Sequence, residues 1–148
     1  HAITTVYLRY AQAVKLPAPL TGFADGTAQW VLHRGALGLP DNEVAVVISV
    51  SDCTEAWKDK DLAEKVHADV KRICPDLGKP EAVRIITEKR ATTAATVDFV
   101  QPDFSWLHHR RIYPAGDYLH PRYPATLEAA VQSGFAAAEK LMLDFRFE

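Results

Sequence analysis

A run of apolar, mostly β-branched residues in the first third of the chain constrains its fold most. Val44 to Val50 is the longest clean apolar stretch, and it has the length of a strand rather than the roughly 18 residues that a membrane span requires. Nearly all of Glu43 to Val50 is Val, Ile or Ala, which is typical of a strand buried on both faces. The chain is therefore expected to build a sheet that includes this buried strand.

Four further segments have the pattern of strands. Ile3 to Tyr10 alternates and is rich in β-branched and aromatic residues. Leu20 to Ala24 and Ala28 to Arg34 flank the turn-like pair Asp25-Gly26, which predicts a hairpin. With Ala82 to Thr87 as another strand, we expect an α+β fold with a mixed or antiparallel sheet of about four to five strands.

One amphipathic helix is expected in the middle of the chain, beginning at Thr54 or Asp59 and ending at Ile73. Acidic and basic residues separate its apolar positions, and Asp69 is expected on its polar face. The apolar residues at helical spacing are Leu62, Ala63, Val66, Val70 and Ile73.

The last third of the chain predicts a strand, a turn and a long helix. Arg110 to Tyr113 has the pattern of a short strand, and Pro114 to Asp117 has that of a turn. The helix is expected from Tyr123 onward, with Pro124 in its first turn. A helix amino terminus presents free N–H groups and the positive end of the helix dipole, which favour phosphate, carboxylate or an electron-rich carbonyl.

Two positions in that turn have the chemistry of a binding site. Gly116 allows close approach of the backbone to a ligand, and Asp117 offers an acceptor for sugar hydroxyls. The alternative is a plain helix start without a ligand. For the neighbouring run His108 to Arg111, a solvated surface turn is favoured over an anion or metal site, because a metal needs further ligands held in geometry.

Charge and motifs exclude several classes of function. The 148 residues include 17 Lys and Arg against 19 Asp and Glu, so the chain lacks the basic excess that nucleic-acid binding requires. It contains neither GxGxxG nor a Gly-Lys-Ser/Thr phosphate loop, and neither HExxH nor GxSxG. A self-contained nucleotide-binding enzyme, a nucleic-acid partner and a metal site are therefore not expected.

The two cysteines predict the redox environment. Cys53 and Cys74 flank the expected helix, whose rise of about 1.5 Å per residue holds them too far apart for a disulfide. Free thiols are typical of a reducing compartment, so we expect a cytoplasmic location.

The turn and helix near the carboxyl end also resemble a known family. Ala115-Gly116-Asp117, followed by Tyr123 to Gly134, is similar to the C-terminal signature of the flavin amine oxidase and phytoene desaturase superfamily. The resemblance spans nearly the whole chain in colinear order, and it departs at Tyr113-Pro114 and in the connector 97–109. Three upstream segments resemble one branch, the squalene-associated FAD-dependent desaturases, also called hydroxysqualene dehydroxylases: Gly26 to Val31, Val46 to Ser49 and Glu88 to Thr92.

The resemblance implies a domain organisation and a cofactor. In such proteins an FAD-binding domain is built from both ends of the polypeptide, with a substrate domain inserted between them. Residues 1–90 would belong to the substrate domain, and residues 91–148 to the C-terminal part of the FAD-binding domain. Implied contacts with FAD are Gly116 and Asp117 at the ribityl and pyrophosphate, and the N–H groups of Ala125, Thr126 and Leu127 at the pyrimidine edge of the isoalloxazine.

The resemblance also implies an FAD-dependent oxidoreductase that acts on an apolar, squalene-type isoprenoid, by hydroxysqualene reduction or by desaturation. The glycine-rich loop of the family is absent, residue 1 is His and the only methionine is Met142. We therefore expect an excised C-terminal piece that is inactive by itself and does not hold FAD tightly. No catalytic residue is assigned, because the flavin performs the chemistry.

A non-catalytic module that binds an apolar ligand or a partner chain is the alternative from a different class. A sheet and a small-residue helix separated from their sister domain would expose apolar patches, which favours self-association. Peripheral contact of the full protein with a membrane is left open. Flavin absorbance in a purified longer protein would separate the two classes.

Overall fold

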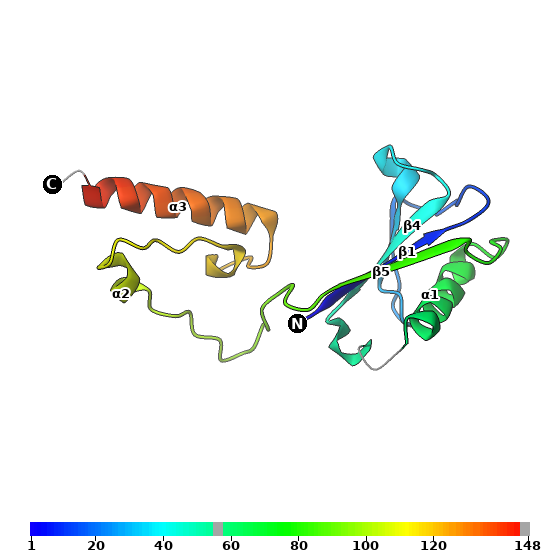
Figure 1. Cartoon of the computed structure of the whole chain (residues 1–148), viewed down its shortest axis with the longest axis horizontal. Coiled ribbons are helices and arrows are strands. Elements are labelled where there is room, and N and C mark those ends of the chain that lie inside the picture. Colours follow the sequence, from blue (N-terminus) through cyan, green and yellow to red (C-terminus); the bar gives the residue numbers. More distant parts are fainter. Residues whose placement is uncertain (55–57, 146–148) are drawn as a thin grey trace. The chain divides into compact units, whose positions relative to one another are not determined.

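The computed structural model describes residues 1–54 and 58–145, without the side chain of Cys53. The chain forms two compact units, His1–Thr92 and Thr93–Glu148, which we call unit 1 and unit 2 and describe separately (Figure 1). Trp57, for which a core position or a ligand pocket could be expected, lies outside the described residues.

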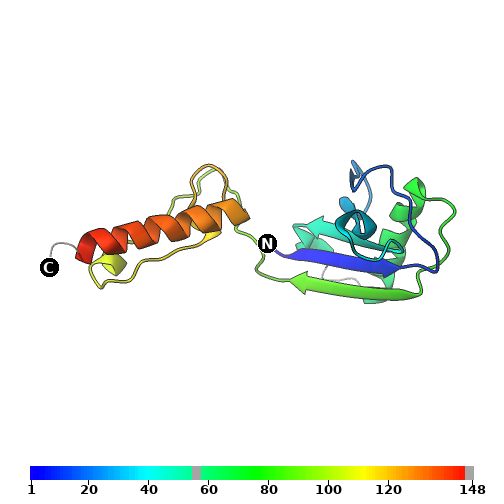
Figure 2. The same ribbon diagram turned by 90° about the horizontal axis from the view of Figure 1, so that it is seen from above.

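Unit 1 is built on a five-stranded sheet in which every neighbouring pair is antiparallel. This arrangement confirms the expected α+β fold. The first strand in sequence lies inside the sheet, and Figure 2 shows it beside the last one. In the order of the sheet, the strands are β2 (Leu20–Gly22), β3 (Trp30–His33), β4 (Glu43–Ser49), β1 (Ile3–Arg9) and β5 (Ala82–Glu88).

One face of this sheet is covered by α1 (Asp59–Ile73), the helix expected in the middle of the chain (Figure 1). Alternate residues of β1 and β4 point toward it, so the period of two in the strands meets the period of 3.6 in the helix. Each large apolar side chain buried there stabilises the fold by roughly 1.5–3 kcal/mol. The fully or almost fully buried members of this core include Val6, Leu8, Val31, Val44, Val46, Ile48, Leu62, Val66 and Val70.

A carboxylate on α1 fastens the β2–β3 turn to the helix. Asp69 Oδ2 accepts hydrogen bonds from the N–H groups of Thr27 (2.7 Å) and Ala28 (2.9 Å). Asp69 is only 9% exposed, so its expected position on the polar face was wrong. Gly26 has φ of 101° and comes so close that an added Cβ would lie 2.6 Å from Asp69 Oδ1, which leaves only glycine suited to the turn.

The thiol of Cys74 is buried and free, and it donates a hydrogen bond to the carbonyl of Lys15 (3.2 Å). Burial raises the pKa of Cys74. The expectation of a free thiol is confirmed for this residue, while the side chain of Cys53 lies outside the description.

Unit 2 contains the short helix α2 (Ser105–His108), the 3₁₀ turn η3 (Asp117–Leu119) and the long helix α3 (Leu127–Phe145). The expected strand at Arg110 to Tyr113 is absent, because those residues continue the turn after α2 into an irregular segment. A strand needs a neighbour for its ladder, and the described part of unit 2 contains no other strand. The favoured surface turn at His108 to Arg111 is confirmed.

Candidate functional site

The turn at Gly116 is attached to α3 by its backbone. The N–H of Gly116 donates to Ser133 Oγ (3.0 Å), one polar side chain on a helix that is otherwise rich in alanine. A Cβ added at Gly116 would overlap the ring of Tyr118. A larger residue would have to displace this exposed ring, so glycine suits a close contact within the protein, in addition to any approach by a ligand.

Asp117 begins η3 directly after this glycine, and its side chain is half-buried. Within the described part of the chain, its carboxylate has no hydrogen-bond or ion-pair partner. A carboxylate held in a turn with both oxygens free can accept hydrogen bonds from ligand hydroxyls. The position is thus compatible with the role expected for Asp117.

Helix α3 begins at Leu127 rather than at Tyr123, because Thr126 supplies the cap. Thr126 Oγ1 accepts a hydrogen bond from the N–H of Ala129 (3.1 Å), and its hydroxyl donates to the carbonyl of Tyr123 (3.0 Å). This pattern is typical of an N-cap. Pro124, which we had expected in the first turn of the helix, therefore lies before the helix.

The residues before and after this cap leave backbone donors open. Ala125 adopts φ of 62°, in the left-handed region that few non-glycine residues occupy, and Leu127 is 90% exposed. The N–H groups of the first helical turn, at Leu127 and Glu128, have no intrahelical partner. The amino terminus of α3 therefore combines free donors with the positive end of a 19-residue helix.

An aromatic cluster that sequence reasoning missed holds the loop between these two features. His120 stacks on Tyr123 with ring centroids 3.7 Å apart, and Nδ1 of His120 accepts hydrogen bonds from the N–H groups of Arg122 and Tyr123 (both 3.3 Å). Its Nε2–H then donates to Gln132 Oε1 (3.2 Å). Only the polar residues Gln132 and Ser133 within an alanine-rich helix could have signalled these contacts.

The structure thus packs the turn of Gly116 and Asp117 against α3, whose amino terminus follows Ala125 and Thr126. Ser133, which holds Gly116, is six residues from Leu127, a rise of about 9 Å along the helix. An extended ligand with hydroxyls at one end and an electron-rich carbonyl at the other would meet Asp117 and the free amides of α3. The donor and acceptor set therefore fits the ribityl chain and pyrimidine edge of a flavin.

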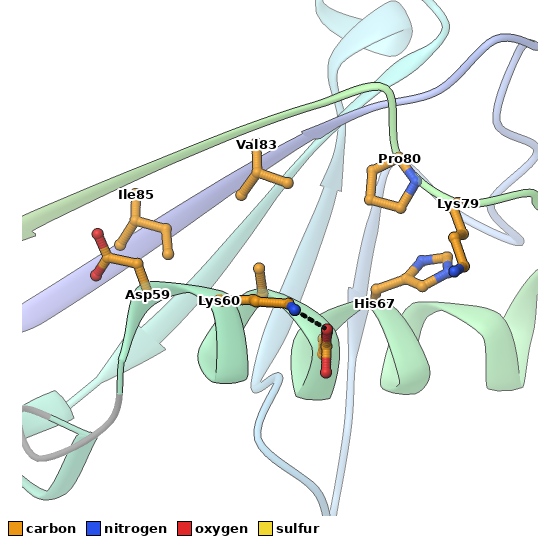
Figure 3. Close-up of a pocket in the computed structure, with 9 residues that line it drawn as sticks. Asp59, Lys60, His67, Lys79, Pro80, Val83 and Ile85 are labelled. Atoms are coloured by element: carbon orange, nitrogen blue, oxygen red, sulfur yellow. Dashed lines mark ion pairs between the residues drawn. The ribbon is translucent and has the colours of Figure 1, made fainter.

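Unit 1 has a separate groove of about 670 Å³ between α1 and β5. Figure 3 shows Lys60 in its middle, and His67 and Lys79 at one end. Lys60 forms an ion pair of 3.9 Å with Glu64, which also lines the groove. The surface between these charges is apolar, because Ala63, Pro80, Val83 and Ile85 form part of the lining.

His67 at the end of this groove is tied to the core through Tyr10. The buried hydroxyl of Tyr10 lies 3.1 Å from His67 Nδ1, and burial raises the pKa of Tyr10 so that it stays a donor. Burial, followed by the charges of Lys71 and Lys79, lowers the pKa of His67. The ring is therefore neutral near pH 7, and its contact with Tyr10 gives it a structural role.

The described residues offer neither a cluster of metal ligands nor a membrane-spanning helix. No group of three or more His, Cys, Asp or Glu side chains there could hold a metal ion. No described helix is long and apolar enough to cross a membrane.

Comparison with known proteins decides the family. The profile of flavin containing amine oxidoreductases matches residues 6–142. The chain belongs to this family. The recognition made from the Gly116 turn and the following helix is thereby confirmed, and the family supports FAD as the cofactor of the protein to which this chain contributes.

Relatives within the family are hydroxysqualene dehydroxylases. That of Rhodopseudomonas palustris is 30% identical over 145 residues, which are 95% of this chain and 32% of the relative. That of Zymomonas mobilis is 26% identical over 129 residues, 81% of this chain and 28% of the relative. The chain spans about a third of the length of the curated relatives that it matches.

A solved structure shares the fold. A protein from Exiguobacterium sp. 255-15, assigned as a protoporphyrinogen oxidase, superimposes with a TM-score of 0.58 at 18% identity, over 93% of this chain and 35% of that one. At this identity the likeness shows the fold alone. It supports the expected α+β fold.

Proposed function

We propose that this flavin amine oxidoreductase chain is part of a longer FAD-dependent enzyme that acts on a squalene-type isoprenoid, by reduction of hydroxysqualene or by desaturation. The names of the two relatives support the substrate class. The observation that carries the proposal is the unpaired carboxylate of Asp117, in a turn that Gly116 bonds to α3, together with the free amides at the amino terminus of that helix. In this reading unit 1 contributes to the substrate domain, and unit 2 to the FAD-binding domain.

When bound, the flavin supplies hydride transfer to or from a substrate carbon. The chain's own residues position it. Asp117 would accept hydrogen bonds from the ribityl hydroxyls, and the amides of Ala125, Thr126 and Leu127 would donate to the pyrimidine edge. Because these amides lie at the positive end of a helix dipole, they stabilise negative charge on a reduced flavin.

Replacement of Asp117 by Ala in the full-length protein tests this reading. Loss of a hydrogen bond to a carboxylate costs about 1.5–3 kcal/mol, so the affinity for FAD should fall by about ten- to a hundredfold. FAD affinity would be measured by fluorescence titration of the apoprotein. The matched control is Glu139→Ala, which removes an exposed carboxylate from α3.

The result would count against the proposal if Asp117→Ala and Glu139→Ala bound FAD equally well. In that case the turn would be a plain helix start, and the non-catalytic binding or assembly module, with self-association through exposed apolar surface, would be favoured. The inactivity of the 148-residue chain alone, its cytoplasmic location and peripheral contact with a membrane stay predictions.

A further inference from the structure

The sheet of unit 1 has a second face, which α1 does not cover. Because side chains alternate along a strand, this face carries the residues that point away from the core. One cross-strand row on it is largely apolar, and its outer members Trp30 and Ile86 are 48% and 44% exposed. This row, which we call the apolar row, consists of Trp30, Val47, Thr5 and Ile86 in order of register.

Arginines also lie on this face, near the carboxyl end of β1 and the amino end of β4, which are neighbours in the sheet. Arg84 pairs with Tyr7 across β1 and β5, Arg9 pairs with Glu43 across β1 and β4, and Arg34 follows β3 directly. These five residues line one hollow of about 490 Å³. It holds three guanidinium groups and a single carboxylate, a formal charge of +2.

The single carboxylate among the lining residues, that of Glu43, already has an ion-pair partner. Glu43 forms an ion pair with Arg34 at 2.6 Å, and both side chains are at least three-quarters buried, at 25% and 19% exposure. The Arg34 guanidinium also lies over the ring of Tyr7, 5.3 Å from its centroid. Arg34 is therefore held in one orientation, with its charge compensated.

The other two arginines lack such compensation. Within residues 1–54 and 58–145, the guanidinium groups of Arg9 and Arg84 have no hydrogen-bond or ion-pair partner. Since Arg9 is opposite Ala82, it is a diagonal neighbour of Arg84, a spacing of about 7–8 Å that long side chains bridge. Two like charges at this spacing repel each other, and an anion between them would remove the repulsion.

We propose that this hollow binds the phosphate or diphosphate group of a ligand whose apolar tail lies along the apolar row. Arginine suits this task because its planar fork donates two parallel hydrogen bonds to phosphate oxygens. Two uncompensated guanidinium groups match the two charges of a phosphate dianion better than they match the one charge of a carboxylate ligand. The exposed ring of Trp30 and the side chain of Ile86 supply the surface for the tail.

This inference goes beyond the proposed function and does not depend on flavin binding. It can therefore be tested on the 148-residue chain without FAD. Inorganic pyrophosphate, octyl phosphate below its micelle concentration, and octanol would each be titrated and followed by NMR. Pyrophosphate should shift the signals of residues around Arg9 and Arg84, octyl phosphate should also shift the indole of Trp30, and added salt should weaken both interactions.

Substitutions make the test specific. Arg84→Gln and Arg9→Gln should each weaken binding of pyrophosphate by about tenfold, the loss of one charge-assisted hydrogen bond. Arg90→Gln removes the same charge from an exposed residue just beyond β5 and outside the hollow, so it should bind as the unchanged chain does. Unchanged NMR signals of core residues would show that each variant is folded.

Three outcomes would overturn the proposal. The first is equal affinity of Arg84→Gln, Arg9→Gln and Arg90→Gln for pyrophosphate. The second is equal binding of octanol and octyl phosphate, which would reduce the surface to an apolar patch. The third is binding to vesicles of phosphatidic acid and phosphatidylcholine but to neither soluble phosphate, which would assign the arginines to lipid headgroups at a membrane.

Discussion

The fastening of the β2–β3 turn to α1 depends on one carboxylate, and its removal should destabilise unit 1 measurably. Asp69→Ala deletes two charge-assisted hydrogen bonds, to the N–H groups of Thr27 and Ala28. The N–H of Thr27 can turn to water, but Ala28 is 1% exposed and its N–H would stay unpaired. A buried donor without a partner costs about 1–3 kcal/mol, so with the lost bonds we expect about 2–4 kcal/mol.

Asp69→Asn separates the hydrogen bonds from the charge. Because a single oxygen, Oδ2, accepts both bonds, an amide carbonyl in its place keeps them. The new NH₂ group would replace Oδ1, which lies 3.5 Å from the guanidinium of Arg72. The loss should therefore be smaller than for Asp69→Ala, about 1 kcal/mol.

Native-state amide hydrogen exchange of Val6 and Val46 would measure these differences. Both residues are fully buried in the core of unit 1, so their exchange reports the free energy of opening that unit without interference from unit 2. Asp76→Ala, an exposed carboxylate after α1, is the control and should stay within about 0.5 kcal/mol of the unchanged chain. Equal protection in Asp69→Ala and Asp76→Ala would refute the reasoning.

The remaining predictions concern pH, redox state and the cofactor. Because the pKa of His67 is lowered in the folded chain, the unfolded chain binds a proton at this residue more readily. The contribution of His67 to stability should be complete above a pH of about 6.5 and should decline as the pH falls toward the folded pKa. The unfolding midpoints of the unchanged chain and of His67→Gln should therefore diverge across that range. Cys74 should react slowly with Ellman's reagent under native conditions and at once in denaturant, and fast native labelling at Cys74, located by mass spectrometry, would contradict its burial. The 148-residue chain should bind FAD only weakly, since it lacks the glycine loop; micromolar affinity by titration would disprove this.

Local patterns predicted the sheet and α1 because each of those elements buries one face. The expected burial of β4 on both faces was wrong in part, since on the face away from α1 Ala45 is buried but Val47 is only partly buried. The alternation in β1 and the apolar run in β4 follow directly from the core that they share. Burial of Asp69 is a tertiary property, however, since nothing in the sequence of α1 shows that a turn some forty residues earlier would use it.

The candidate site was predictable in position but not in detail. Gly116 and Asp117 belong to a short signature, whereas the contacts that hold this loop join Gly116 to Ser133 and His120 to Gln132, 17 and 12 positions apart. We placed the start of α3 too early because Pro124 suits the first turn of a helix. In the structure the hydroxyl of Thr126 caps the helix instead, so the helix begins after Thr126.

The position of β1 inside the sheet has a consequence for how unit 1 folds. Strand β1 is made first but pairs with β4 and with β5, where Ile3 meets Glu88. Closing loops of that length is entropically costly and slow, so β1 lacks these two partners until β4 and β5 are synthesised. The hairpin of β2 and β3 is local, and we expect it to form early and to provide the edge onto which β4, then β1 and finally β5 assemble.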